Sequence, residues 1–164
     1  MNALAIFGIS ALMSTISWGI VAKLYVWPRL QSVERNRALA MLVAPHMFRF
    51  VGLSFLVTGV VSSSLPAAFA VPAAYGDFVA GVLAIIAAVA LWQRASWAIT
   101  TAWAFNLWGT ADLLLAFYDG PHSGLQPGAL GATFFLVTAI VPALLISHAL
   151  IFGLLVRPEL RRAA

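Results

Sequence analysis

Polar side chains that can bind or react lie inside a stretch of this chain that is otherwise apolar. Asn106 and Asp112 fall within residues 97–117, WAITTAWAFNLWGTADLLLAF, a stretch long enough to cross a lipid bilayer as a helix. A helix in lipid tolerates such side chains only where they face protein, water or a ligand. We therefore expect the other helices to pack around 97–117 and to shield its polar side.

Asp77 and Asp112 are predicted to lie at the same depth. Consecutive membrane helices run antiparallel, and from a turn at Arg94 Asp77 is 17 residues back and Asp112 is 18 forward. At a rise of about 1.5 Å per residue, the two carboxylates reach nearly the same level. Two adjacent carboxylates in a low dielectric need one proton, or a cation between them. The alternative for Asp77 is an acid in the first turn of its helix, where the helix dipole favours it.

Asn106 and Asp112 are six residues apart, which turns them about 120° away from each other on a helix. They are therefore not expected to contribute to one site with a single neighbour. Trp103 shares the face of Asn106, and Trp108 shares the face of Asp112. We treat these four residues, together with Asp77, as candidate ligand-binding residues. The alternative for Asn106 is a hydrogen bond to a neighbouring helix.

A second polar group is predicted nearer the arginine-rich helix ends. His46 and Arg49 are three residues apart and share a face, and His148 reaches about the depth of Arg49. An imidazole suits proton transfer, and an arginine can hold an anionic group. His148, His46 and Asp112 are thus candidate catalytic residues, and Arg49 is a candidate ligand-binding residue. The alternatives are that His46 and Arg49 snorkel at the interface and that His148 only packs.

The sequence predicts no metal site and leaves the cofactor undetermined. The chain has no cysteine, which excludes disulfides, iron–sulfur clusters and cysteine zinc sites. It contains no HExxH motif, no glycine-rich phosphate loop and no Gly-x-Ser-x-Gly motif. Two intramembrane histidines on different helices could ligate a haem, although chance alone supplies two histidines.

The composition predicts an all-α integral membrane protein. Of the 164 residues, 63% are hydrophobic and 9% are charged, whereas a soluble domain is about half apolar and a quarter charged. We expect a single domain, residues 1–164, with a bundle of five transmembrane helices. The predicted helices are approximately 3–27, 41–63, 74–92, 97–117 and 129–156. Residues 28–40 are predicted to form a segment on the cytoplasmic surface of the membrane.

Charged residues predict the orientation of this bundle. If the chain crosses the membrane five times, every arginine near a helix end lies on one side of the membrane. The loops on the opposite side contain no lysine or arginine. These arginines are Arg29, Arg35, Arg37, Arg94, Arg157, Arg161 and Arg162. The positive-inside rule then places the N-terminus outside and the C-terminus in the cytoplasm. The compact five-helix layout and the short loops make the bacterial inner membrane the expected location. Because the chain has no basic stripe with interleaved aromatic residues, nucleic acid is not an expected partner.

Small residues recur every four positions along the third predicted helix. Gly76, Ala80, Ala84 and Ala88 form a ridge that permits close helix packing. This ridge indicates a possible homo-oligomer or membrane complex.

Three functions fit these patterns. The first is binding or transport of a lipophilic small molecule or ion in a polar intramembrane pocket. The second is a membrane-embedded enzyme that performs acid–base chemistry on a lipid-soluble substrate. The third is a structural subunit of a membrane complex, in which the polar residues only join helices. Whether the protein is an enzyme stays open at this stage.

Overall fold

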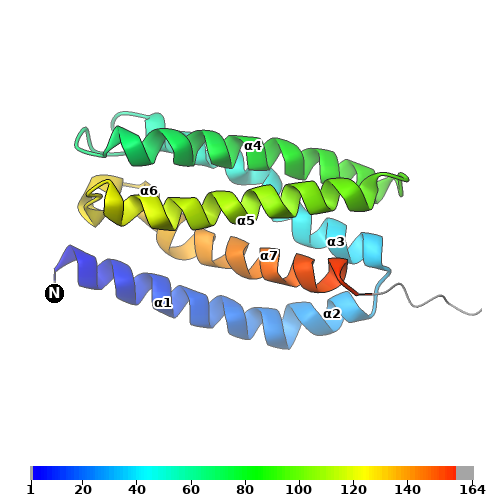
Figure 1. The fold of residues 1–164 in the computed structure, drawn as a ribbon. Helices are drawn as coiled ribbons and strands as arrows, with labels where there is room; N and C mark the ends of the chain where they lie inside the picture. The colour runs from blue at the N-terminus through cyan, green and yellow to red at the C-terminus, as the bar shows by residue number, and fades with distance from the viewer. Residues whose placement is uncertain (1, 158–164) are drawn as a thin grey trace, which may run out of the picture.

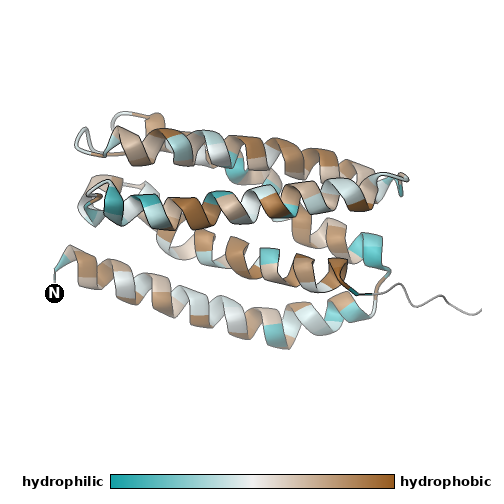
Figure 2. Ribbon diagram, viewed as in Figure 1, coloured by the Kyte–Doolittle hydropathy of each residue, from teal (hydrophilic) through white to brown (hydrophobic). Residues whose placement is uncertain are grey.

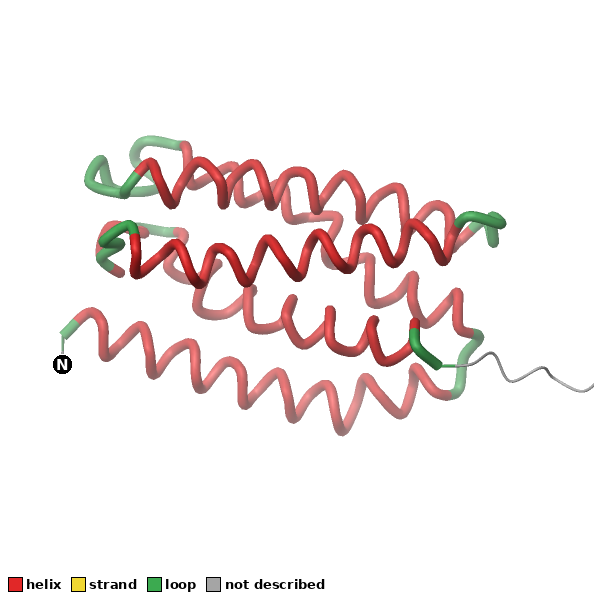
Figure 3. The backbone as a smooth tube through the Cα atoms, in the orientation of Figure 1, coloured by secondary structure: helices red, strands yellow, loops and turns green. Residues whose placement is uncertain are grey.

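The computed structural model describes residues 2–157, and these residues form an all-α fold in which helices are joined by short turns (Figure 3). The helical elements, in chain order, are α1 (Ala3–Val21), η1 (Ala22–Val26), α2 (Trp27–Gln31), α3 (Arg35–Val43), η2 (Ala44–Leu56), α4 (Ala67–Trp92), α5 (Ala98–His122), η3 (Pro127–Leu130), α6 (Thr133–Phe135), η4 (Leu136–Ile140) and α7 (Val141–Leu155).

Successive helical runs alternate in direction along one common axis (Figure 1). The N-terminus and the loops 57–66 and 123–132 lie at one end of the bundle, and the turns at 32–34 and 93–97 lie at the other. We call these the amino end and the arginine end. Arg157, the last described residue, belongs to the arginine end, whereas Arg161 and Arg162 lie outside the described residues.

Within residues 2–157, four helical runs are long and apolar enough to cross a membrane, namely Ala3–Gln31, Arg35–Leu56, Ala67–Trp92 and Thr133–Leu155. The helix α5 is 25 residues long but is not one of these four. It holds Asn106 and Asp112, and Figure 2 shows hydrophilic residues interrupting its hydrophobic stretches.

Several predicted helix limits are wrong. The first run does not end before Pro28 but continues to Gln31, since the π-turn of η1 precedes the proline and accommodates the backbone bond that it cannot make. The second run begins at Arg35 and ends at Leu56. The expected surface segment 28–40 is mostly helical, and its helical residues belong to the end of the first run and the start of the second.

The limits of the later helices differ as well. The helix α4 begins at Ala67, directly after Pro66, rather than near 74. From Ala44 onward the second run is a 3₁₀-helix, and this stretch starts beside Pro45. In the last run the π-turn of η4 precedes Pro142, as η1 precedes Pro28.

The helix α1 lies at the edge of the bundle, and none of its residues is buried. Two of its side chains nevertheless bind the last run at its π-turn. Ser14 Oγ and Trp18 Nε1 both donate to the carbonyl of Ala139, at 3.3 and 3.0 Å. Thr15 instead bonds back to the carbonyl of Ala11 in its own helix. Ser14 and Thr15 thus show the two kinds of bond usual for hydroxyls in a membrane helix, one to a neighbouring helix and one to a carbonyl of the same helix.

The centre of the bundle is built around α4, which packs against η2 on one side and α5 on the other. Ala80 and Ala84 are fully buried, and a Cβ at Gly81 would lie 3.4 Å from the backbone nitrogen of Phe50. The predicted small-residue ridge therefore serves, at these alanines, the close approach of helices within one chain. Assembly with a second chain stays a prediction.

Side chains join the helices at the arginine end. Arg35 donates to the carbonyls of Leu154 and Leu155 at 3.0 and 2.6 Å and so caps the C-terminus of α7. Arg94, in the turn at 93–97, forms an ion pair with Glu34, in the turn at 32–34.

Candidate functional site

Arg49 lies at the centre of a buried ionic cluster that joins three helices. Its side chain, on η2, is 1% exposed. The Nε atom donates to Asp77 Oδ1 of α4 at 2.7 Å, and Nη2 donates to Asp112 Oδ2 of α5. Nη1 donates to the carbonyl of Gly109 at 3.2 Å. Each of the three guanidinium nitrogens therefore has an acceptor, and breaking such a buried arrangement costs far more than breaking a surface ion pair.

His148 of α7 extends this cluster to a fourth helix. Its Nε2 lies 3.5 Å from Arg49 Nη1, and its Nδ1 lies 2.7 Å from Asn106 Oδ1. The amide nitrogen of Asn106 donates to the carbonyl of His148 at 3.3 Å. These contacts place the proton of a neutral imidazole on Nδ1 and leave Nε2 as the acceptor facing Arg49. We call Arg49, Asp77, Asp112, Asn106 and His148 the Arg49 cluster.

His46 lies beside the cluster without joining its hydrogen bonds. It is fully buried, and among the described residues neither of its ring nitrogens has a partner. Its ring packs 4.3 Å from the ring of His148 and 5.0 Å from that of Phe105, measured between centroids. The two imidazoles lie against each other, so a porphyrin does not fit between them.

Three glycines create the space for the cluster. A Cβ at Gly52 would overlap Asp77, and a Cβ at Gly76 would overlap Asp112. A Cβ at Gly109 would lie 2.6 Å from the His148 ring and 2.9 Å from the guanidinium of Arg49. The charged groups can meet only because each neighbouring helix presents bare backbone at these points.

The structure changes the predicted grouping of these residues. Asp77 is not an acid in the first helical turn, because α4 begins at Ala67 and Asp77 is buried at 7% exposure. The cation between the two carboxylates is Arg49, which the sequence placed nearer the arginine end. That placement was wrong because the second run starts at Arg35 rather than 41, and because its 3₁₀ stretch rises about 2.0 Å per residue.

Asn106 and Asp112 do point in different directions, as the helical geometry predicts. Both nevertheless belong to one cluster, since Asn106 reaches it through His148 and Asp112 through Arg49. Neither Arg49 nor His46 snorkels to an interface, because Arg49 is 4% exposed and His46 is 0% exposed.

The two candidate tryptophans lie outside the cluster. Trp108 is about half exposed and donates from Nε1 to the carbonyl of Gly76 at 3.3 Å. Trp103 packs its ring 5.7 Å from that of Phe152. Both are separate from the cavity described next.

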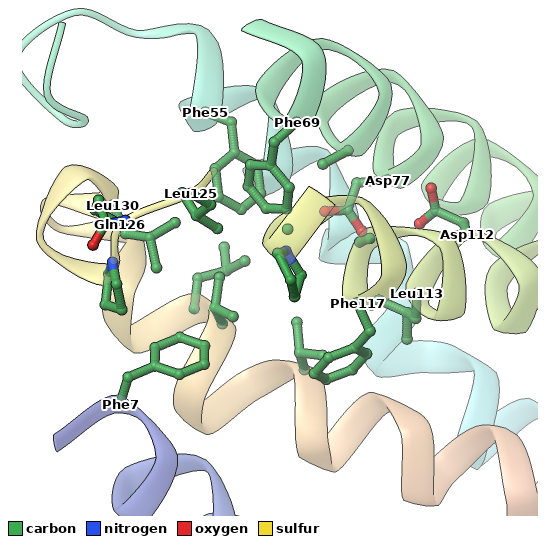
Figure 4. A pocket seen from close by; sticks show the side chains of 18 of the residues that line it. Phe7, Phe55, Phe69, Asp77, Asp112, Leu113, Phe117, Leu125, Gln126 and Leu130 are labelled. Atoms are coloured by element: carbon green, nitrogen blue, oxygen red, sulfur yellow. The ribbon is translucent and has the colours of Figure 1, made fainter. Parts of the chain in front are cut away.

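A cavity of about 350 Å³ adjoins the cluster on the side of the amino end (Figure 4). Asp77 and Asp112 lie at one end of it, and Gln126 lies at the other. We call this cavity the main pocket. Its walls carry phenylalanines from four different helical elements, which are Phe7, Phe55, Phe69 and Phe117.

A smaller cavity of about 100 Å³ lies between η2 and the last run. Asp77 lines both cavities, whereas Arg49 and Gly52 line only the smaller one. His46 and His148 line neither cavity. Of the Arg49 cluster, only the carboxylates of Asp77 and Asp112 line the main pocket.

The phenylalanines and Gly52 were not predicted as site residues. Four rings on four separate helical elements share no spacing along the chain, so no sequence pattern marks them. A weak signal did exist for Gly52, which lies three residues after Arg49 and so on the same helical face.

Comparisons with known proteins identify the family alone. Among the described residues, no group of three or more histidine, cysteine, aspartate or glutamate side chains could hold a metal ion. No curated protein and no solved structure matches the chain. A family model described as Domain of unknown function (DUF8737) matches residues 6–156. The chain therefore belongs to the DUF8737 family.

Proposed function

We propose that this protein is a multi-pass membrane protein that binds a lipophilic small molecule in the main pocket. The observation that carries the proposal is a largely apolar cavity of about 350 Å³ with two carboxylates at one end. Small-molecule sites have this form, with apolar walls and a few polar groups that fix the orientation of the ligand. The Arg49 cluster holds those carboxylates rigidly, because Arg49 contacts both of them.

In this proposal the chain crosses the membrane five times, with α5 as the additional span. Its polar residues Asn106 and Asp112 turn toward Arg49 and His148, so lipid does not have to solvate them. The arginine end faces the cytoplasm and the amino end faces outward, because the loops 57–66 and 123–132 contain no lysine or arginine. The bacterial inner membrane is the proposed location, in keeping with the short loops.

The enzyme alternative has less support from this geometry. Catalysis by His46 or His148 requires substrate access, and both residues are at most 1% exposed and do not line the main pocket. Asp112 does line the pocket, but it is already paired with Arg49. Arg49 is already occupied by Asp77, Asp112 and a carbonyl, so it is not poised to hold an anionic substrate. The alternative of a structural subunit explains the cluster but gives no role to the cavity.

The proposal is tested by extracting the protein with mild detergent, purifying it, and identifying the bound small molecules by mass spectrometry. We expect a stoichiometric lipophilic compound in the wild type and its loss in Ala116→Trp, which places an indole in the main pocket. Ala111→Trp is the matched control, because Ala111 is an exposed residue of the same helix outside the pocket. Equal occupancy in Ala116→Trp and wild type, with both folded, would show that the compound does not occupy this pocket.

A further inference from the structure

We propose that the ligand of the main pocket is a lipophilic cation, namely a protonated amine or a quaternary ammonium on an aromatic or aliphatic body. This inference rests on the proposed binding function and adds the chemical class of the ligand. Two features carry it: the balance of charge at one end of the pocket, and the aromatic rings along its walls.

The Arg49 cluster has more negative than positive charge. It pairs two carboxylates, Asp77 and Asp112, with a single guanidinium. His148 adds no positive charge, because its Nε2 faces an N–H of Arg49 and an imidazole can accept there only when neutral. With both carboxylates ionised, one negative charge is left over. An uncompensated buried charge is costly, so either a bound cation or a proton at this point is favoured.

Both carboxylates line the main pocket, so the surplus charge lies at its end. Each carboxylate uses one oxygen for Arg49, and among residues 2–157 no donor reaches the other oxygen of either group. Asp77 is 7% exposed, and both side chains line the end of the main pocket seen in Figure 4. The two oxygens without a donor lie against the backbones of Gly52 and Gly76, so an ammonium group in the pocket would be attracted by the charge of the carboxylates.

The walls suit the same class of ligand. Aromatic rings attract cations through their faces, and four phenylalanines line the pocket. Phe55 and Phe69 meet edge to face with centroids 5.5 Å apart, which fixes their positions. No lysine, arginine or histidine of the described residues lines the main pocket, so an anion would meet two carboxylates that share only the one guanidinium of Arg49. A volume of about 350 Å³ fits a ligand with one or two rings.

The competing outcome is that a proton neutralises the second carboxylate and that the ligand is uncharged. A matched set of three probes separates these cases: phenylbutyl-trimethylammonium, its carbon isostere with a tert-butyl head, and phenylbutyl sulfonate. Binding is measured by equilibrium dialysis with the full chain in nanodiscs, and empty nanodiscs are subtracted as background. We expect the ammonium to bind at least about tenfold more tightly than the carbon isostere, with no binding of the sulfonate.

Two variants locate the preference. Asp112→Asn should reduce the affinity for the ammonium to that for the carbon isostere and leave the latter unchanged, whereas Asp119→Asn, a carboxylate of α5 outside the main pocket, should change neither. Because Asp112→Asn disturbs a buried cluster and its folding is at risk, Phe117→Leu is the second variant. Phe117 is 46% exposed, and its loss should weaken ammonium binding by about two- to fivefold more than isostere binding.

The outcomes separate the two proposals. If the carbon isostere binds wild type as tightly as the ammonium does, the cationic class is wrong while the binding function stands. If the preference for the ammonium survives Asp112→Asn and Phe117→Leu unchanged, it does not arise in this pocket and the inference is overturned. If none of the three probes binds above empty nanodiscs, both the cationic class and the proposed binding function fall.

Discussion

The carboxylate of Asp112 rests against the backbone of Gly76, at the point where any other residue would place its Cβ. The same relationship holds between Asp77 and Gly52 and between His148 and Gly109. A charged network can therefore form in the middle of an apolar bundle because bare backbone leaves room for it.

Substitution of Gly76 by alanine should loosen the cluster. The added methyl must displace the Asp112 carboxylate from Arg49, and we expect a loss of about 1–3 kcal/mol in the free energy of unfolding. Gly19→Ala is the control, since nothing lies within 4 Å of a Cβ there and alanine favours the interior of a helix. Thermal unfolding in detergent checks this, and equal melting temperatures for the two variants would contradict it.

Removal of the Arg49 charge should be strongly destabilising. Arg49→Met leaves two buried carboxylates without a counter-charge, at an expected cost of about 3–5 kcal/mol. The triple variant Arg49→Met, Asp77→Asn, Asp112→Asn should recover most of this loss, because its buried side chains are uncharged. Chemical unfolding curves measure both effects.

The control for that series is Arg94→Met at the arginine end. Arg94 pairs with Glu34, but both side chains are about half exposed or more, so the loss should stay below about 1 kcal/mol. A triple variant no more stable than Arg49→Met would show that the charge balance is not what holds the helices together.

The two buried histidines should respond differently to an apolar replacement. His148→Leu removes contacts to Asn106 and Arg49 and leaves their polar groups unpaired, at an expected cost of about 1–3 kcal/mol. His46→Leu removes a ring that has no hydrogen-bond partner among the described residues, so stability should stay within about 1 kcal/mol of wild type or rise. Parallel thermal melts compare them, and a severe loss for His46→Leu would indicate a partner for that imidazole.

The proposed orientation can be tested with single cysteines, because the chain has none of its own. Ser63 lies in an exposed loop at the amino end and Ser96 in an exposed turn at the arginine end. In intact cells an impermeant maleimide should label Ser63→Cys and should label Ser96→Cys only after permeabilisation. Labelling of both sites in intact cells, or the reverse pattern, would refute the five-span topology with the N-terminus outside.

The all-α class could be predicted from hydropathy, because apolar runs of about twenty residues permit little else. The common depth of Asp77 and Asp112 also followed from counting residues away from the turn at Arg94, and the structure brings both to Arg49. The position of Arg49 itself did not follow. It depends on where the second helical run starts and on its change to a 3₁₀-helix, and Pro45 alone does not reveal either.

The main pocket was beyond prediction for another reason. Hydropathy places a phenylalanine in a helix but does not say toward which neighbour its ring turns. The predicted pocket used Trp103 and Trp108 because they lie near Asn106 and Asp112 along the chain. In the structure the walls come instead from helices that are distant in sequence, and Phe7 and Phe117 are an example.

The edge position of α1 has a consequence for how a ligand arrives. Leu4 and Phe7 of this helix line the main pocket, yet α1 has no buried residue and is tied to the last run by bonds from Ser14 and Trp18 to a single carbonyl. A molecule already dissolved among the acyl chains would need to displace only this outer wall. Its occupancy would then follow its mole fraction in the bilayer, so that adding lipid at a fixed total amount of ligand would lower the measured occupancy.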